Sequence, residues 1–564
     1  MARCGVVPIG VTLIWSFWCA ATIPSAQAQA RPAAAAESDG FVIRDSLVTA
    51  KCVRCHVRDS SGRMGRLSYM RKTPEGWEAS VRRMASLSDV KISPTEARAI
   101  VKYFANRQGL APAEVRAGRF ETERRFVDYR YAGDAATERT CRACHSMGRV
   151  LLQRRTRNEW ELLVATHRGY YPNSDFQAFR RSGPASDSAP VPHPMDQAIT
   201  HLSRAFPLQT PEWTAWSATM RPAPLEGTWL LSGYEVGRGA LYGRLTVTKV
   251  KGTDDEFTTR AVYRYASGGA PVVRDGKSMV YTGHQWRGRS SAMATSADSA
   301  WREVMSVEPG WQEMSGRWFR GGYDEFGIDI TARRLGSGAT VDGVLPKALA
   351  RGARDVEVTV FGANLSKTAA LDFGPGVRVT RVVRASADEI VARVSVDSAA
   401  RVGSRDLFVG GAALKDAIVT YDRIDRIRVL PNSHMARVGG IRFPKQYARF
   451  EAVGVSNGAD GKPDTADDIV TGALPVTWSL EEYGVTYKDD DVRYVGQIDQ
   501  QGFFTPNIDG PNASRAGQKN NIGDVYVVAS YQPPGLAARP LKARSLLIVT
   551  VPLYMRWEPT RTSP

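Results

Sequence analysis

The sequence predicts a multidomain protein in which a mostly α-helical domain precedes three all-β domains, an antiparallel barrel followed by two immunoglobulin-like sandwiches. The chain has 564 residues, 43% of them apolar and 24% charged, a globular composition that excludes disordered, collagen-like and multi-span membrane proteins. Helix-start signals occur before residue 222, for example Ser93-Pro94-Thr95-Glu96. From Leu225 onward, apolar and polar residues alternate between Gly and Asp turns, which is the pattern of β-strands.

The first 30 residues have the pattern of a secretory signal peptide. Arg3 precedes an apolar stretch over residues 6–24, and the segment ends in small residues around Ala28. A membrane anchor is the alternative, but the apolar stretch is interrupted by polar residues and is short for a membrane span. The sequence therefore predicts cleavage near residues 28–30, no membrane anchor and export to the periplasm.

Four cysteines remain after Cys4 and Cys19 leave with the signal peptide, too few for a disulfide-dense scaffold. They form two Cys-x-x-Cys-His motifs, the attachment pattern of c-type haem. In this pattern two thiols add to the two vinyl groups of one porphyrin, and the adjacent histidine reaches the iron. A redox dithiol or a zinc site is the competing interpretation, but two motifs with no thiol left over favour two covalently bound haem c groups. The predicted haem-binding residues are Cys52, Cys55 and His56 in the first motif and Cys141, Cys144 and His145 in the second.

An internal repeat predicts the sixth ligand of each iron. Residues 71–84 and 154–167 are identical at five of 14 positions, and each segment has a tryptophan seven residues before its end. Seven residues are two helical turns, so the tryptophan and the last residue share one helix face. That last residue is Met84 in the first segment and His167 in the second, and both residue types are axial ligands of haem. The expected ligand pairs are His56 with Met84 and His145 with His167.

The two ligand pairs predict different reduction potentials. A thioether ligand raises the potential of a haem and a second imidazole lowers it, so electrons are expected to run from the His/His haem to the His/Met haem. The alternative sixth ligands are Met64 and Met70 for the first haem, and His193 and His201 for the second. Met147 is too close to its own motif to reach the other side of the haem.

The predicted domains are a dihaem cytochrome c domain, an antiparallel β-barrel, an immunoglobulin-like β-sandwich and a C-terminal β-sandwich, over residues 40–222, 223–336, 337–423 and 424–564. The sequence of the β domains shows no Ser/His/Asp set, no Gly-rich phosphate loop and no metal cluster, so we interpret them as scaffold or docking surface. The carboxylates from Asp460 to Asp468 are spaced like those of a calcium loop but lack a complete EF-hand pattern. A solvated turn is the other interpretation of this segment.

The chain is basic, with a formal net charge of +17. Residues 51–222 contain 29 Lys and Arg against 17 Asp and Glu, so the helical domain holds +12 of this excess. A basic face steers acidic partners and speeds association, and haem propionates need cationic neighbours. Nucleic acid is the other partner of basic domains, but export and haem argue against it. We therefore expect an acidic protein partner and no nucleic acid.

These features together resemble the α subunit of quinohaemoprotein amine dehydrogenases. The two Cys-x-x-Cys-His units, the repeated segment that ends in Met84 and the order of the β domains carry the resemblance, which covers essentially the whole mature chain. It implies a complex with a β-propeller subunit and a small subunit that carries cysteine tryptophylquinone. It also implies that primary amines are oxidised at that quinone, and that electrons pass through two haems to a periplasmic acceptor, a cupredoxin or another cytochrome c.

The cysteine count supports this division of labour independently. With all four mature cysteines assigned to haem, the chain cannot itself form a cysteine–tryptophan quinone, so we expect no catalytic residue for amine oxidation in it. Two other hypotheses remain. A dihaem peroxidase needs an iron whose sixth position opens, and a stand-alone periplasmic cytochrome c uses its β domains to bind a partner or a surface.

Overall fold

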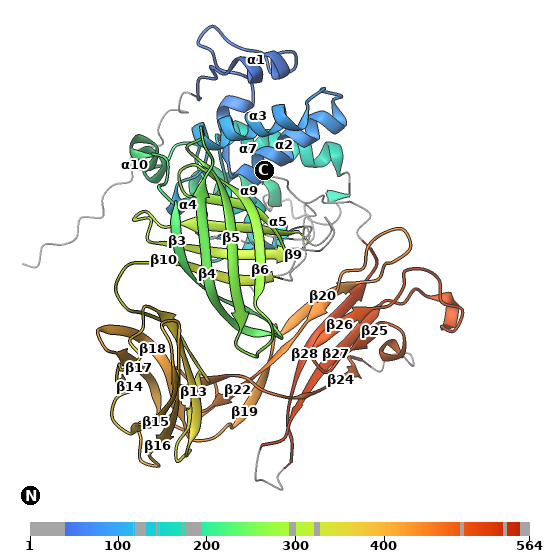
Figure 1. Ribbon diagram of the computed structural model, residues 1–564. Coiled ribbons are helices and arrows are strands. Elements are labelled where there is room, and N and C mark those ends of the chain that lie inside the picture. Colours follow the sequence, from blue (N-terminus) through green and yellow to red (C-terminus); the bar gives the residue numbers. More distant parts are fainter. Residues whose placement is uncertain are drawn as a thin grey trace, which may run out of the picture. The chain divides into compact units, whose positions relative to one another are not determined.

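The computed structural model describes residues 40–116, 118, 131–142, 145, 147–171, 173–174, 193–292, 300–320, 327–484, 490–533 and 539–552 (Figure 1). The predicted signal peptide and Cys144 lie outside these residues. Helices occupy the described chain before residue 222 and strands dominate after it, so the predicted order of a helical domain and several all-β domains is confirmed. Among the described helices, none combines the length and apolar character that a membrane span requires.

The described helices are α1 (Ser46–Cys52), α2 (Pro74–Leu87), α3 (Pro94–Arg107), α4 (Pro112–Val115), α5 (Ala135–Arg142), α6 (Gly148–Leu151), α7 (Arg157–Tyr170), α9 (Pro194–Ala205) and α10 (Pro211–Thr219). Several begin where the sequence supplies a capping side chain. Ser93 and Glu96 form a capping box at the start of α3, as their spacing predicts. The hydroxyls of Thr73 and Thr156 accept hydrogen bonds from the first turns of α2 and α7. These two helices therefore start at equivalent positions of the repeat.

The two repeated segments pair with each other. β1 (Met70–Lys72) and β2 (Gln153–Arg155) form a two-stranded antiparallel sheet in which Arg71 lies opposite Arg154. These arginines occupy equivalent positions of the repeat, so an approximate twofold axis relates the two segments locally. Each strand leads directly into the helix that carries a predicted sixth ligand, α2 or α7.

A buried carboxylate holds this pair of arginines. The two Nη atoms of Arg71 donate to the two carboxylate oxygens of Glu114 at 2.8 Å, and Arg154 Nε lies 3.1 Å from the same carboxylate. None of the three side chains is more than 7% exposed. Burial acts to raise the pKa of Glu114, but the hydrogen bond and charge of Arg71 and the charge of Arg154 outweigh it and lower the pKa. The ionised carboxylate therefore joins the two repeats.

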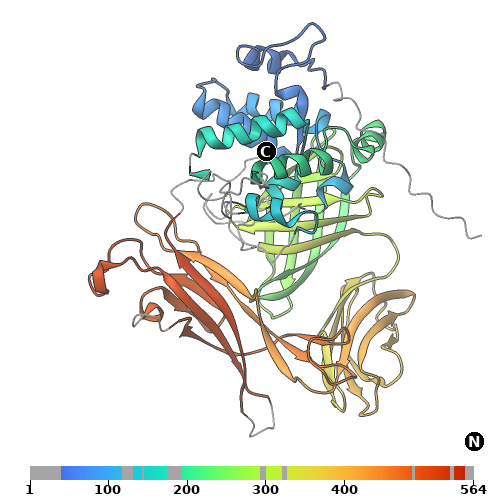
Figure 2. The same cartoon turned by 180° about the vertical axis from the view of Figure 1, so that it is seen from behind.

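The next strands form the closed antiparallel barrel that the sequence predicts (Figures 1 and 2). They are β3 (Gly227–Glu235), β4 (Gly239–Lys249), β5 (Glu256–Tyr265), β6 (Val272–Tyr281), β7 (Gln285–Ala292), β8 (Trp301–Val307), β9 (Glu313–Arg320) and β10 (Gly327–Arg334). Along β5 buried and exposed residues alternate, the period-2 pattern of a strand with one face in a core. β10 pairs with β3 and closes the barrel.

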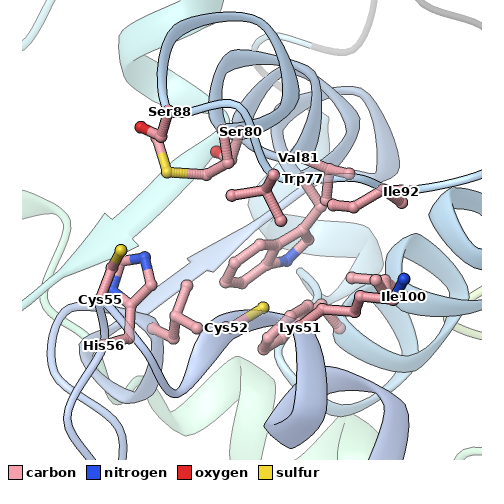
Figure 3. A pocket seen from close by; sticks show the side chains of 14 residues that line it. Lys51, Cys52, Cys55, His56, Trp77, Ser80, Val81, Ser88, Ile92 and Ile100 are labelled. Carbon is pink, nitrogen blue, oxygen red and sulfur yellow. The ribbon is translucent and has the colours of Figure 1, made fainter.

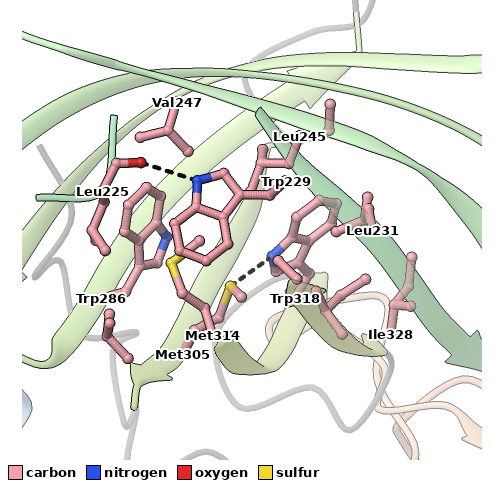
Figure 4. Close-up of a cluster of buried hydrophobic side chains, with 14 of the residues drawn as sticks. Leu225, Trp229, Leu231, Leu245, Val247, Trp286, Met305, Met314, Trp318 and Ile328 are labelled. Carbon is pink, nitrogen blue, oxygen red and sulfur yellow. Dashed lines mark hydrogen bonds between the residues drawn. The ribbon is translucent and has the colours of Figure 1, made fainter. Parts of the chain in front are cut away.

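Tryptophans fill the inside of the barrel (Figure 4). Trp229, Trp286 and Trp318 are each fully buried. Trp229 Nε1 donates to the carbonyl oxygen of Leu225 at 3.0 Å, and Trp318 Nε1 lies 3.4 Å from the sulfur of Met305. Because a small barrel filled by such side chains is a packed core, this domain acts as a rigid body.

The third unit has two four-stranded sheets, ordered β11-β13-β16-β15 and β12-β18-β17-β14, whose apolar side chains share one core. Its strands are β11 (Thr340–Leu345), β12 (Ala348–Ala350), β13 (Val356–Ala363), β14 (Leu371–Asp372), β15 (Val377–Ala385), β16 (Glu389–Val396), β17 (Gly403–Val409) and β18 (Ala412–Tyr421). The two sheets agree with a sandwich, and the immunoglobulin-like assignment stays a prediction.

The C-terminal strands form three sheets, ordered β19-β22-β23, β20-β28-β27-β24 and β21-β26-β25, around a core that includes Phe450, Trp478 and Phe504. The strands are β19 (Arg426–Leu430), β20 (Ser433–Arg437), β21 (Ala448–Arg449), β22 (Glu451–Ser456), β23 (Ile469–Ala473), β24 (Thr477–Glu482), β25 (Gly496–Ile498), β26 (Phe503–Pro506), β27 (Gly523–Tyr531) and β28 (Leu541–Thr550). β20 pairs in parallel with β28. The C-terminal β-sandwich assignment stays a prediction.

Buried polar contacts join the helical domain to the barrel. Arg287 of β7 forms an ion pair with Glu75 of α2, with Nη2 3.2 Å from one carboxylate oxygen. His284 Nε2 donates to the carbonyl oxygen of Leu110 at 3.0 Å, and its side chain is 1% exposed. Burial lowers the pKa of His284 to about 4, so the ring is neutral at ordinary pH.

We expect Glu114→Gln to lower the free energy of unfolding by about 3–5 kcal/mol, because it leaves two buried arginines without a counter-charge. The pKa of Glu114 is lowered in the folded chain, so its contribution is present above about pH 4.5 and is lost as the pH falls through the folded pKa. Urea unfolding of the full chain, followed by circular dichroism of the helices, measures the change. Glu161→Gln is the matched control, since Glu161 forms a half-exposed pair with Arg157. Equal losses for the two variants would contradict the assigned role of Glu114.

Acid should weaken the contact between the helical domain and the barrel through His284. Between pH 6.5 and about 4 the unfolded chain binds a proton at this histidine that the folded chain does not, so stability falls as the pH falls. The slope for one such group is about 1.4 kcal/mol per pH unit. The amide of the glutamine in His284→Gln keeps a hydrogen-bond donor for the Leu110 carbonyl oxygen but does not titrate. The variant should therefore lose this pH dependence of the free energy of unfolding, measured from unfolding curves between pH 6.5 and about 4. An unchanged slope in the variant would show that another group causes the acid sensitivity.

Candidate functional site

The first Cys-x-x-Cys-His motif lies against a partly open cavity (Figure 3). Cys52, Cys55, His56 and Met84 all line this cavity, so the structure brings together every residue predicted for the first haem. Apolar side chains form most of the remaining wall: Leu67, Trp77, Val81, Val90, Ile92, Ile100 and Phe104. A cavity with an apolar wall and a few convergent donor atoms is typical of a cofactor site.

Local backbone structure orients the histidine of this motif. α1 ends at Cys52, and the backbone N–H groups of Cys55 and His56 both donate to the Cys52 carbonyl oxygen, which turns the chain back. His56 Nδ1 donates to the carbonyl oxygen of Gly65 at 2.9 Å. Burial lowers the pKa of His56, which favours the neutral ring. The Nδ1 hydrogen bond leaves Nε2 as the ring nitrogen available to a metal.

Helix α2 brings Met84 to the cavity, and Trp77 fixes the face of the helix that does so. Trp77 is 1% exposed, stacks on Phe104 with ring centroids 4.3 Å apart, and donates from Nε1 to the Gln108 carbonyl oxygen at 3.2 Å. The alternative ligands Met64 and Met70 are buried in the adjoining apolar core and do not line the cavity. Of the three methionines, Met84 is therefore the one that shares the cavity with His56.

The described thiols are not paired in disulfides. Cys52, Cys55 and Cys141 are free cysteines. Burial, with the neighbouring Cys55, raises the pKa of Cys52 to about 11. Within the described parts of the chain, no group of three or more His, Cys, Asp or Glu side chains is arranged to hold a metal ion.

The second motif has Cys141 at the end of α5, with His145 just beyond it. The centroids of the His145 and His167 rings lie 6.4 Å apart, and the two ring planes are tilted by 45°. Two imidazoles that share one metal through bonds of about 2 Å have centroids roughly 6 Å apart, so this spacing fits a common iron. His167 Nδ1 donates to the carbonyl oxygen of Leu163 at 2.8 Å, which leaves its Nε2 available. Burial, and then the charge of Asp134, raises the pKa of Cys141 to about 12.

The alternative histidines have other structural roles. His193 caps α9, and its Nδ1 accepts a hydrogen bond from the backbone N–H of Met195 at 3.2 Å. His201 Nε2 is 2.8 Å from the hydroxyl oxygen of Tyr131. These contacts favour His167 as the partner of His145.

Two buried cations occupy equivalent positions beside the tryptophans that the two repeated segments share. Lys72 lies over the ring of Trp77 with Nζ 5.3 Å from its centroid, and Arg155 lies over Trp160 with Cζ 5.7 Å from its centroid. Burial, followed by the charges of Arg155 and Arg83, lowers the pKa of Lys72 well below its ordinary value. Trp160 Nε1 is buried with no hydrogen-bond partner among the described residues. These groups fit a cofactor with anionic substituents such as haem propionates.

Sequence reasoning did not assign a role to Lys72, Arg155 or Glu159. The repeat contains a signal for the two cations, because a basic residue precedes the capping threonine in both segments. Glu159 has no such signal, since its equivalent in the first segment is Gly76.

The acidic segment from Asp460 to Asp468 has its carboxylates already engaged. Arg426 pairs with Asp464 at 3.1 Å and also with Asp468. Asp467 accepts hydrogen bonds from the backbone N–H groups of Ala459 and Asp460 at 2.7 and 3.1 Å. These contacts engage the carboxylates of Asp464, Asp467 and Asp468 within the protein, while Oδ1 of Asp468 is buried with no hydrogen-bond partner among the described residues.

Comparison with solved structures gives only weak likenesses. A redesigned β-barrel is 12% identical, with 21% of this chain and 98% of that chain covered and a TM-score of 0.18. Human protocadherin-24 EC1-2 is 12% identical, with 38% and 99% covered and a TM-score of 0.16. SGBP-B of the Bacteroides ovatus mixed-linkage glucan utilization locus is 9% identical, with 58% and 61% covered and a TM-score of 0.18. At these scores the likenesses carry no argument, and no curated protein matches the chain.

Sequence profiles give a clear result. The haem-binding profile of the quinohemoprotein amine dehydrogenase alpha subunit matches residues 42–213. Profiles for domains II, III and IV of the same subunit match residues 222–335, 338–422 and 427–562. The four matches follow one another along nearly the whole described chain. The chain therefore belongs to the family of quinohemoprotein amine dehydrogenase alpha subunits, with a haem-binding domain followed by domains II, III and IV.

Proposed function

We propose that this chain is the electron-transfer subunit of a periplasmic quinohaemoprotein amine dehydrogenase. It carries electrons from a tryptophylquinone on a partner subunit, through two c-type haems, to a periplasmic acceptor during the oxidative deamination of primary amines. The observation that carries the proposal is the apolar cavity that gathers Cys52, Cys55, His56 and Met84. When bound, the two haems supply one-electron carriers, and the residues of this chain hold and tune them.

At the first site Cys52 and Cys55 would attach the haem, and His56 and Met84 would supply the ligands of its iron. The Gly65 carbonyl oxygen holds His56 in the tautomer that presents Nε2. The apolar wall, with Trp77 at its centre in Figure 3, excludes water from the iron. A dry site with a thioether ligand stabilises the reduced state, which suits a late carrier in the electron path.

At the second site Cys141 and Cys144 anchor the porphyrin, and His145 and His167 bind the iron. The hydrogen bond from His167 Nδ1 to Leu163 supports a basic Nε2 and so favours the oxidised iron. Two firmly held imidazoles leave no open position, which is the property that distinguishes a carrier from a peroxidase. Electrons are therefore expected to enter at the second haem and leave from the first.

The proposed partners are a β-propeller subunit and a small subunit that carries cysteine tryptophylquinone. Because haem attachment uses every cysteine of the mature chain, amine oxidation belongs to such a partner. The +12 charge of residues 51–222 favours an acidic acceptor, a cupredoxin or another cytochrome c. The packed barrel and the strands after it then serve as a frame for the other subunits.

Addition of a simple primary amine without oxygen should reduce both haems of the complex purified from its own periplasm. Visible spectra before and after the amine measure this, and dithionite gives the fully reduced reference. A mass spectrum of the same sample identifies the quinone-bearing subunit and the two covalent haems. Haems that respond to dithionite but not to the amine, with all subunits present, would favour a stand-alone cytochrome. Peroxide turnover by the same sample would favour the peroxidase.

Met84→His should leave the first haem covalently attached but replace its thioether ligand with an imidazole. We expect its potential to fall by an appreciable part of the roughly 0.8 V range that axial ligands span. Redox titration followed by visible absorbance measures the two haems separately. Met64→His is the control and should leave both potentials in place. A fall with Met64→His but not with Met84→His would reassign the ligand.

A further inference from the structure

An arginine in an unusual conformation follows the residue that holds His56. Arg66 has φ of 65° and ψ of −50°, outside the regions that side chains other than glycine readily adopt. Its neighbour Gly65 provides the carbonyl oxygen that accepts the hydrogen bond from His56 Nδ1. Backbone strain of this kind persists only where surrounding contacts impose it. The contacts of Arg66 therefore identify what imposes it.

The side chain of Arg66 reaches the helix of the other repeat. Its Nε lies 3.3 and 3.2 Å from the two carboxylate oxygens of Glu159, and its Nη1 lies 3.4 Å from the hydroxyl oxygen of Thr166. Both partners are on α7, and Thr166 immediately precedes the proposed iron ligand His167. One side chain thus connects the loop that orients His56 with the helix that carries His167.

Glu159 is a buried carboxylate between two cations. It is 1% exposed, and Arg155 Nη1 donates to it at 3.3 Å in addition to the contact from Arg66. Through Arg66, this carboxylate is connected to the loop in which the Gly65 carbonyl oxygen holds His56. A residue of the second repeat thus provides charge at the first haem site.

Helix α2 has no carboxylate at the position that is equivalent to Glu159 of α7, so it cannot make the corresponding contact with the second repeat. Gly76 occupies the position in α2 that is equivalent to Glu159 in α7. A Cβ atom at Gly76 would lie 2.9 Å from the Cβ of Lys72, which is closer than real Cβ contacts, so the site has no room for a side chain. The local twofold symmetry of the repeat is broken at this position, and only α7 carries a carboxylate there.

We propose that Arg66 and Glu159 are positioning residues that connect the ligand sets of the two haems and set the difference between their reduction potentials. The inference rests on the proposed haem ligation. A buried negative charge favours the more positive, oxidised iron, so Glu159 lowers the potential of the first haem and Arg66 raises it. The pair therefore adjusts the difference that the Met84 and His167 ligands create.

The test is a redox titration of the holoprotein, with the two haems resolved by visible absorbance, for Glu159→Gln, Arg66→Gln and Arg66→Lys. Glu159→Gln should raise the potential of the first haem more than that of the second, and Arg66→Gln should lower it. The equilibrium constant for electron exchange between the haems should change about tenfold in each case, in opposite directions, which is about 59 mV for one electron. Arg66→Lys keeps the charge and should restore most of the parent difference.

Glu161→Gln is the matched control. Glu161 lies two residues further along α7 and pairs with Arg157 on the exposed side of the helix. Glu161→Gln removes one negative charge from α7, as Glu159→Gln does, and should leave the reduction potentials of both haems unchanged. Equal shifts for Glu159→Gln and Glu161→Gln, or shifts of the same sign for Glu159→Gln and Arg66→Gln, would overturn the inference and leave a purely structural link.

The ligand spectra separate this inference from the proposed function. Parent protein without two covalent haems, or with a first haem that lacks the absorption of a methionine-ligated ferric iron, would contradict the proposed ligation itself. Parent spectra as expected, with no change of potential in the variants, would overturn only the role of Arg66 and Glu159. If Glu159→Gln does not mature, the opposed behaviour of Arg66→Gln and Arg66→Lys decides the question.

Discussion

The carboxylate of Glu114 is the constraint on which the arrangement of both haem sites depends. It neutralises Arg71 and Arg154, the two residues that face each other where the repeated segments pair. A buried ion pair of this kind adds little net stability, since desolvation offsets its attraction, but it is costly to break and so selects one arrangement. Any other register of the two short strands would leave a buried arginine unpaired. The starts of α2 and α7, and with them the two proposed sixth ligands, follow from this pairing.

The two sites differ although the segments that build them are related. The first has a partly open apolar cavity with a thioether on its wall, and the second has two imidazoles whose centroids lie 6.4 Å apart. The difference arises at single positions of the repeat, Met84 against His167 and Gly76 against Glu159. The shared tryptophan and its buried cation provide a common frame. Small changes on a repeated frame thus give two sites with different side chains.

Local patterns in the sequence predicted the haem-binding domain, the grouping of the first motif with Met84 and the barrel, because those features depend on residues close together in the chain. The Cys-x-x-Cys-His motifs, the seven-residue step from Trp77 to Met84 and the alternation in β5 are all of this kind. Glu114 and Arg66 could not be found in this way, because their partners lie 40 or more residues away. The division of the C-terminal unit into three sheets also depends on distant pairings, such as the parallel contact of β20 with β28.

The position of Glu114 in the chain has a consequence for the order of folding. Glu114 lies after Arg71 and before Arg154 in the sequence. Because the chain is synthesised from its N-terminus, Glu114 can form its bidentate ion pair with Arg71 before Arg154 has been added. The first repeated segment then has an unpaired edge on β1, and the carboxylate of Glu114 can still accept the contact from Arg154. The second half completes its own structure by docking onto this template. The first repeated segment thus provides the strand with which the second segment pairs.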